Sequence, residues 1–144
     1  MPKIIDGRSL AKNIQKKIEV EIRKNNLKPS LAVILIGNNE ASRLYVNLKK
    51  KACEKVGIEF HEYSITKEVN TKHILEIINF LNEDEGTDAI LIQLPLPKHL
   101  NTNKIIKALQ PEKDVDGFHP KNIKKILEDK NVFIPGLPLG IIKL

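Results

Sequence analysis

The sequence is poor in the residues from which several kinds of functional site are built. Its 144 residues include one cysteine, no tryptophan, two tyrosines and four phenylalanines. The single cysteine, Cys53, excludes an intrachain disulfide and a cysteine-based metal site. So few aromatic side chains argue against a surface that stacks nucleic-acid bases. The spacing of the histidines matches no metal-ligand pattern, so we expect no metal site at His61, His73, His99 or His119.

Two further absences concern phosphates and membranes. The glycines form neither a Walker loop nor a Gly-x-Gly-x-x-Gly pattern, so the sequence predicts no cradle for dinucleotide phosphates. The apolar start at residues 1–7 is short and soon turns polar, which is unlike a signal peptide. No apolar run has the length of a membrane span. We therefore expect a cytoplasmic protein that contacts no membrane.

Size and charge indicate an ordinary globular domain. The chain is long enough for one domain, and hydrophobic residues make up 41% and charged residues 29% of it, as is usual for soluble proteins. The net charge of +6 is spread over lysine-rich segments without a long block of one sign. This favours solvated helix faces over a nucleic-acid surface. The sequence thus predicts no nucleic-acid partner, and a steep salt dependence of DNA or RNA retention would contradict that.

Apolar periodicity predicts alternating helices and strands. Helices are expected over 10–25, 40–56, 71–82, 101–109 and 121–128, and residues 141–144 look like the beginning of another. Strands are expected over 31–36, 58–65 and 89–94. Alternation with short connections predicts an α/β fold, a three-layer α/β/α sandwich with a mostly parallel sheet of about four strands.

The helices should bury apolar stripes against this sheet. The first helix repeats an apolar residue every four positions, at Leu10, Ile14, Ile18 and Ile22. The second should turn inward Leu44, Leu48 and Ala52. The third should turn inward Ile74, Ile77, Ile78 and Leu81. Cys53, within the second helix, is expected to be a small buried side chain.

Polar groups gather where the predicted strands end. Ser42, Tyr45 and Lys49 stand at i, i+3 and i+7, so they share one face of the second helix. Gln93 closes an apolar strand, and a polar loop that contains Asp116 follows the fourth helix. Ligands of parallel α/β sheets bind outside the carboxyl ends of the strands. The convergence predicts a functional site there.

Each group has a functional and a structural interpretation. Lys49 can transfer a proton if partial burial favours its neutral form, or it is a solvated lysine on a lysine-rich face. Tyr45 stacks on a flat ligand or packs half-buried on the sheet. Gln93 holds a ligand, orients the lysine or forms a turn. Of Asp114 and Asp116, one can accept hydrogen bonds from an amino-pyrimidine edge while the other caps a turn, or both are turn residues.

Three segments together resemble the methylenetetrahydrofolate dehydrogenase/cyclohydrolase family. They are Gly37–Lys49 (GNNEASRLYVNLK), Gln93–His99 (QLPLPKH) and Pro111–Pro120 (PEKDVDGFHP). They occur in the family's order and spacing, and the resemblance covers about residues 3–140. Three long motifs in one order are highly specific.

The resemblance implies an enzyme of one-carbon metabolism that serves purine biosynthesis. Such enzymes oxidise methylenetetrahydrofolate with NADP or NAD and hydrolyse the methenyl product to formyltetrahydrofolate. The match implies that Lys49 is the catalytic acid/base, that Gln93 holds and tunes it, and that Tyr45 stacks on the folate. Asp116 would bond the pterin edge. Substrate contacts are thus implied for Tyr45, Gln93, Leu94, Asp116 and Ser42.

The resemblance also implies a division of the chain. Residues 1–140 would form the folate-binding catalytic domain, and 141–144 would be the truncated start of a linker helix to a dinucleotide-binding domain. We then expect no cofactor site and no metal in this chain, and no dehydrogenase activity from it alone. The alternative is a folate-binding module without turnover that needs a separate dinucleotide domain. Full-length relatives would be possible homodimers.

The carboxyl-terminal segment departs from the family's pattern. Where the family reads Pro-Cys-Thr-Pro-x-Gly, this chain has Gly136 and Leu137 in place of the cysteine and threonine. The family also returns a late helix to its first domain. The resemblance therefore implies that this chain exposes apolar surface.

Overall fold

The computed structural model describes residues 6–128 and 134–144. Helices and strands alternate along the first part of this chain, and helices alone follow. The elements in order are α1 (Gly7–Lys24), β1 (Ser30–Ile36), α2 (Glu40–Val56), β2 (Glu59–Ile65), α3 (Thr71–Glu83), β3 (Ala89–Ile92), α4 (Thr102–Ala108), α5 (Pro120–Leu127) and α6 (Gly136–Lys143).

The strands form a parallel sheet in the order β2-β1-β3. Central β1 pairs with both neighbours, so that Ile34 lies beside Tyr63 and Ile92. A single parallel bridge between Ile90 and Asp114 extends the sheet beyond β3. The α/β class with a parallel sheet is confirmed. Within the described residues the sheet has three strands rather than about four, because the segment at Asp114 pairs at one position only.

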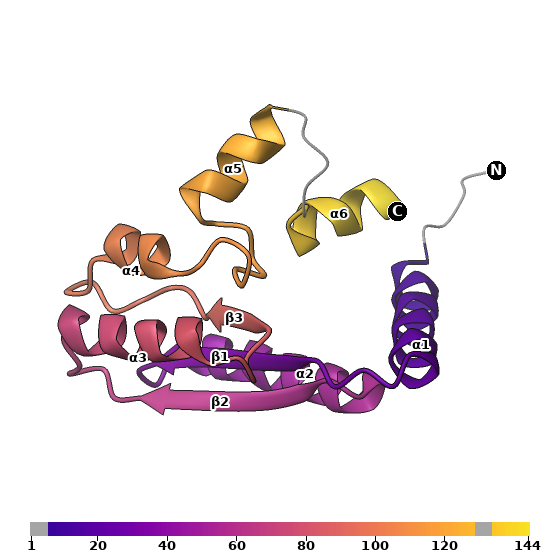
Figure 1. Cartoon of the computed structure of the whole chain (residues 1–144), viewed down its shortest axis with the longest axis horizontal. Coiled ribbons are helices and arrows are strands. Elements are labelled where there is room, and N and C mark those ends of the chain that lie inside the picture. Colours follow the sequence, from indigo (N-terminus) through magenta and orange to yellow (C-terminus); the bar gives the residue numbers. More distant parts are fainter. Residues whose placement is uncertain (1–5, 129–133) are drawn as a thin grey trace.

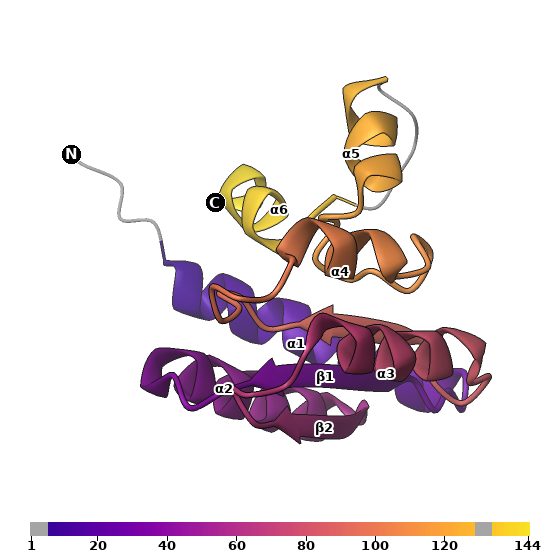
Figure 2. The same ribbon diagram turned by 90° about the vertical axis from the view of Figure 1, so that its left-hand side faces the viewer.

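Helices cover both faces of the sheet, because β1 sends apolar side chains to both. Ala32, Ile34 and Ile36 join the core shared with α3 and α4. Val33 and Leu35 point the other way and pack with Val46 of α2. Figures 1 and 2 show α2 on the face opposite to α3 and α4. Burial on both faces explains why β1 is a continuous apolar run without alternation.

The predicted stripe of α2 is wrong in its register. Leu44 is 58% exposed and Leu48 52%, whereas Ala52 is half-buried. The residues that face the sheet are Ser42, Val46, Cys53 and Val56. Half-buried Lys49 lies on this same stripe. The error arose because the prediction followed the largest apolar side chains, while this helix turns a hydroxyl and an amine inward.

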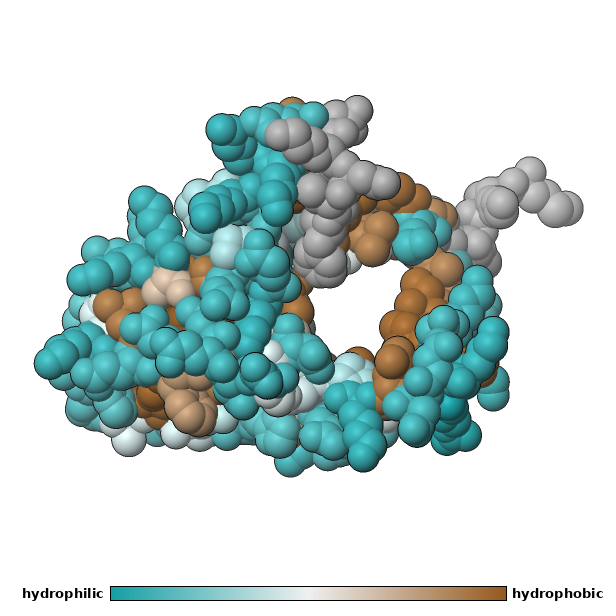
Figure 3. Space-filling model, viewed as in Figure 1, coloured by the Kyte–Doolittle hydropathy of each residue, from teal (hydrophilic) through white to brown (hydrophobic). Residues whose placement is uncertain are grey.

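The predicted stripe of α1 is also only partly correct. Leu10, Ile14 and Ile22 are half-buried, Ile18 is 40% exposed, and no residue of α1 is fully buried. The helix packs on α2, and its remaining apolar side faces α6 across a cavity of about 300 Å³ lined partly by Leu10, Ile14, Leu137 and Ile141. Figure 3 shows hydrophobic side chains of α1 and α6 around this opening. The expected exposed apolar surface is therefore present.

The remaining elements follow the sequence more closely. In α3, Ile74, Ile78 and Leu81 are buried as predicted, and Ile77 is half-buried. The last helix begins earlier than expected, at Gly136, with Pro138 in its first turn, where proline is tolerated. Strand β3 ends at Ile92, although the backbone N–H of Gln93 still donates to Ile34 O at 2.9 Å. None of the described helices is both long and apolar enough to span a membrane.

Candidate functional site

Lys49 and Gln93 meet at the carboxyl end of β3. The Lys49 Nζ donates a hydrogen bond to Gln93 Oε1 at 3.1 Å, across 44 positions of sequence. The same amide donates through Nε2 to the carbonyl of Leu94 at 2.9 Å. Because the amide is held at both ends, its oxygen stays turned toward the lysine. One of the three donors of the Lys49 ammonium is thus fixed and the other two are available.

Asp116 completes a group of three polar side chains. Burial raises the pKa of its carboxyl above the usual value, and the Asp114 carboxylate adds to that rise. The positive charge of Lys49 opposes this rise in pKa. Lys49, Gln93 and Asp116 are the polar triplet of this site. They come from α2, the end of β3 and the loop after the Ile90–Asp114 bridge.

The other predicted site residues lie around this triplet. Ser42 is buried in the first turns of α2, where its backbone N–H donates to the capping Asn39 side chain at 2.9 Å. Tyr45 is 59% exposed on α2, with its ring open to solvent. Leu94 is half-buried and packs against the core next to α3 and α4. Of the predicted site residues, the structure joins Lys49 to Gln93 by a hydrogen bond and Gln93 to the carbonyl of Leu94.

The loop that carries Asp116 also touches the segment that departs from the family pattern. Gly117 has φ +69°, a conformation that side chains with a Cβ rarely adopt. A Cβ at Gly117 would lie 2.8 Å from Pro135 Cγ. Pro135 therefore packs directly on this glycine. Gly136, which follows, has open space around the place of a Cβ, so nothing near it would clash with a larger residue.

The histidines and the cysteine have structural surroundings. His119 caps α5, where its Nδ1 accepts from the Lys121 amide at 3.1 Å. His99 Nε2 lies 2.9 Å from the carbonyl oxygen of Val69. Cys53 is buried as predicted, and burial raises the pKa of its thiol. In residues 6–128 and 134–144, no three histidine, cysteine or acidic side chains gather as a metal site would require.

Sequence reasoning did not identify Asp114 as the aspartate that caps the turn. One of the two loop aspartates was expected to cap a turn, and Asp114 does so, bonding the amides of Gly117 and His119. The signal lies in the spacing, because an aspartate three residues before a glycine commonly accepts the N–H of that position. The sequence could identify Asp114 and Asp116 as a pair but not which of the two caps the turn.

This arrangement suits proton transfer beside a nitrogen heterocycle. A lysine amine supplies or accepts the proton, an amide orients it, and a carboxyl nearby can bind amino groups. The exposed ring of Tyr45 on the same helix offers a flat surface for stacking.

Comparison with known proteins agrees with the resemblance. Residues 5–116 match the family model described as tetrahydrofolate dehydrogenase/cyclohydrolase, catalytic domain. The bifunctional protein FolD of Aquifex aeolicus is 48% identical over an alignment of 146 positions, which covers 98% of this chain and 50% of that protein. The chain therefore spans about half the length of the curated relatives it matches.

Solved structures show the same fold. A 5,10-methylenetetrahydrofolate dehydrogenase from the silkworm Bombyx mori superposes with a TM-score of 0.95 at 33% identity, over 99% of this chain and 51% of that one. The Trypanosoma brucei FolD enzyme, solved with NADP and an inhibitor, has a TM-score of 0.86 at 32% identity, over 94% and 48%. This chain belongs to the tetrahydrofolate dehydrogenase/cyclohydrolase family and corresponds to its catalytic domain.

Proposed function

We propose that this chain binds tetrahydrofolate derivatives at the polar triplet and hydrolyses methenyltetrahydrofolate there. The observation that carries the proposal is the contact between Lys49 and Gln93, with Asp116 close to the same amine. Family membership supplies the substrate class. The pterin lies against Asp116 and the aromatic ring of the folate stacks on Tyr45, with Ser42 and Leu94 in supporting contacts.

The chemistry of this hydrolysis matches the triplet. The methenyl bridge is cationic, and attack by water requires a group that removes a proton as the new C–O bond forms. In its neutral form the Lys49 amine takes that proton and later returns it to the departing ring nitrogen. Gln93 keeps the amine pointed at the bridge through the bond to its Oε1. Asp116 binds the amino group of the pterin and does not itself transfer the proton.

Hydride transfer needs a nicotinamide, and we expect that the loop between β1 and α2 does not hold one. The backbone N–H of Gly37 donates to Ile65 O at 2.8 Å, so it is already used within the protein. The Asn39 side chain caps the start of α2, and Glu40 places a negative charge in the first helical turn. An anion is disfavoured at such a helix start. We therefore expect no oxidation of methylenetetrahydrofolate by NADP or NAD from these residues alone.

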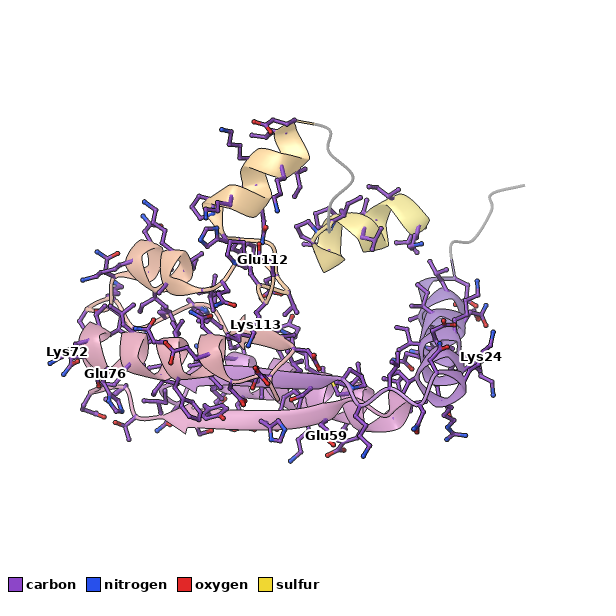
Figure 4. The ribbon with its side chains drawn as sticks, in the orientation of Figure 1. Lys24, Glu59, Lys72, Glu76, Glu112 and Lys113 are labelled. Atoms are coloured by element: carbon purple, nitrogen blue, oxygen red, sulfur yellow. The ribbon has the colours of Figure 1, made fainter. Side chains whose placement is uncertain are left out.

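Calorimetry with tetrahydrofolate tests the binding part of this proposal. We expect Asp116→Ala to weaken tetrahydrofolate binding by about tenfold or more, because a hydrogen bond to a charged carboxylate contributes about 1.5–3 kcal/mol. Glu112→Ala is the matched control, since Glu112 is exposed on the same loop. Figure 4 labels Glu112 next to Lys113 there.

Two outcomes would contradict the proposal in different ways. If Asp116→Ala and Glu112→Ala weakened tetrahydrofolate binding equally, Asp116 would not be part of the binding site. Saturable binding of tetrahydrofolate without hydrolysis of the methenyl form would favour the alternative, a folate-binding module that needs a separate dinucleotide domain. A cytoplasmic location and a homodimer of the kind implied by the resemblance stay predictions.

A further inference from the structure

Asp114 has more hydrogen bonds than a turn aspartate requires. Its side chain is 5% exposed. Oδ1 accepts from the Gly117 amide at 3.1 Å, and Oδ2 accepts from the His119 amide at 2.8 Å and from Asn122 Nδ2 at 3.1 Å. Buried carboxylates are stable only when their oxygens are satisfied in this way. One side chain thus joins both ends of the 114–119 turn to the first turn of α5.

The segment before this turn is fixed from the other side. The buried end of Lys113 donates to the carbonyls of Leu81 at 3.0 Å and Asp84 at 2.8 Å, which close the carboxyl end of α3. The Asn122 side chain also donates to Pro111 O at 2.8 Å. Figure 4 shows Lys113 between the loop and α3. The backbone at Asp114 is therefore anchored to α3, to β3 through the Ile90 bridge and to α5.

Asp116 lies within the turn that these bonds close. Its own side chain is half-buried, and the positive charge of Lys49 reaches it. Gly117, on its other side, is held by the Asp114 bond and by contact with Pro135. The backbone on both sides of Asp116 is thus held by contacts that its own side chain does not make.

We propose that Asp114 is a positioning residue, whose buried carboxylate closes the 114–119 turn and thereby holds the Asp116 carboxyl toward Lys49. It contacts neither substrate nor the reacting atoms. The part that concerns folate affinity rests on the proposed function, whereas the part that concerns the geometry of the turn does not.

The first experiment measures the turn without any ligand. In Asp114→Asn, an NH₂ group replaces one acceptor and faces an N–H donor, so one or more of the three bonds must break. We expect amide hydrogen exchange at Gly117 and His119 to accelerate by about tenfold or more. The pKa of Asp116, followed by NMR of its carboxyl carbon, should fall toward its usual value, since the variant removes a negative neighbour and opens the turn to water.

Two further variants test whether Asp114 acts by positioning the turn, by its charge or by stabilising the fold in general. Asn122→Ala removes one donor without changing any charge, and it should produce the same changes at smaller size. Asp6→Asn is the matched control, because Asp6 also caps a turn with its carboxylate, accepting from the Ser9 amide at 3.0 Å and the Ser9 hydroxyl at 2.6 Å, but lies at the start of α1. This control should change neither the amide exchange rates of Gly117 and His119 nor the pKa of Asp116.

The second experiment measures tetrahydrofolate affinity by calorimetry. Asp114→Asn should weaken tetrahydrofolate binding by about tenfold or more, and the affinity of Asp6→Asn should stay within about twofold of that of the parent chain. The proposal is overturned if Asp114→Asn lowers the pKa of Asp116 while amide exchange in the turn is unchanged, because charge alone would then act. It is also overturned if both aspartate variants weaken binding equally. If the parent chain binds no tetrahydrofolate, the proposed function fails, and the first experiment still decides the role of Asp114.

Discussion

Replacing Lys49 with alanine is expected to slow hydrolysis of methenyltetrahydrofolate by a factor of about 10² to 10⁴, the usual contribution of a positioned acid or base. The loss follows from the proposed mechanism, in which the amine that Gln93 holds at 3.1 Å receives the proton of the attacking water. Tetrahydrofolate affinity should change much less, since Asp116 and Tyr45 remain. Absorbance of the methenyl form follows the rate, and calorimetry gives the affinity.

Lys51→Ala is the control for this substitution. Lys51 lies two residues further along α2 and is exposed, so its loss removes the same charge without touching the polar triplet. The rate of Lys51→Ala should stay within about twofold of the parent rate, because isolated surface charges contribute little. A Lys49→Ala protein that hydrolyses as fast as Lys51→Ala would show that Lys49 is not the acid/base.

Replacing Ile34 with alanine is expected to destabilise the fold by about 2–5 kcal/mol, the cost of truncating a buried isoleucine and leaving a cavity. Ile34 is 0% exposed at the centre of β1, between Tyr63 and Ile92 and under α3. Its neighbours lie on three elements, so they cannot close the gap together. Urea unfolding, with the slope checked for two-state behaviour, measures the change.

Leu44→Ala is a matched control, because leucine and isoleucine are isomers and lose the same atoms. The sequence predicts that Leu44 is buried, whereas the structure leaves it 58% exposed. We expect its truncation to cost under about 1 kcal/mol, since most of its surface is already in water. If Leu44→Ala were as costly as Ile34→Ala, the register of α2 described above would be wrong.

The fold was predictable where apolar pattern and turn chemistry agree. The apolar run of β1 and the apolar periodicity of α3 predicted these two elements close to their observed bounds. Helices whose apolar side is only partly covered were predicted less well. The stripe of α1 was expected to be buried because periodicity reports which side is apolar, not how much of it a partner covers.

The sequence predicts which segments meet at the candidate site, but it does not predict which side chains contact one another there. Spacing placed Lys49 on a helix face and Gln93 at a strand end, and parallel topology placed both at one edge of the sheet. Spacing could not choose between Asp114 and Asp116, because residues two positions apart in an irregular loop have no fixed relative direction. That choice depends on the bonds to Gly117, His119 and Asn122, which form only after α5 folds back.

The most direct test of the central claim is an NMR titration of the labelled chain with tetrahydrofolate. We predict saturable shifts at the Gln93 side-chain amide, the Asp116 carboxyl carbon and the Lys49 side chain, with one common dissociation constant. Two other hollows serve as internal controls: the cavity of about 380 Å³ lined by Lys67, Glu68, Pro97 and His99, and the apolar one between α1 and α6. Shifts gathered at either hollow, with Gln93 and Asp116 unchanged, would contradict the claim that the polar triplet is the folate site.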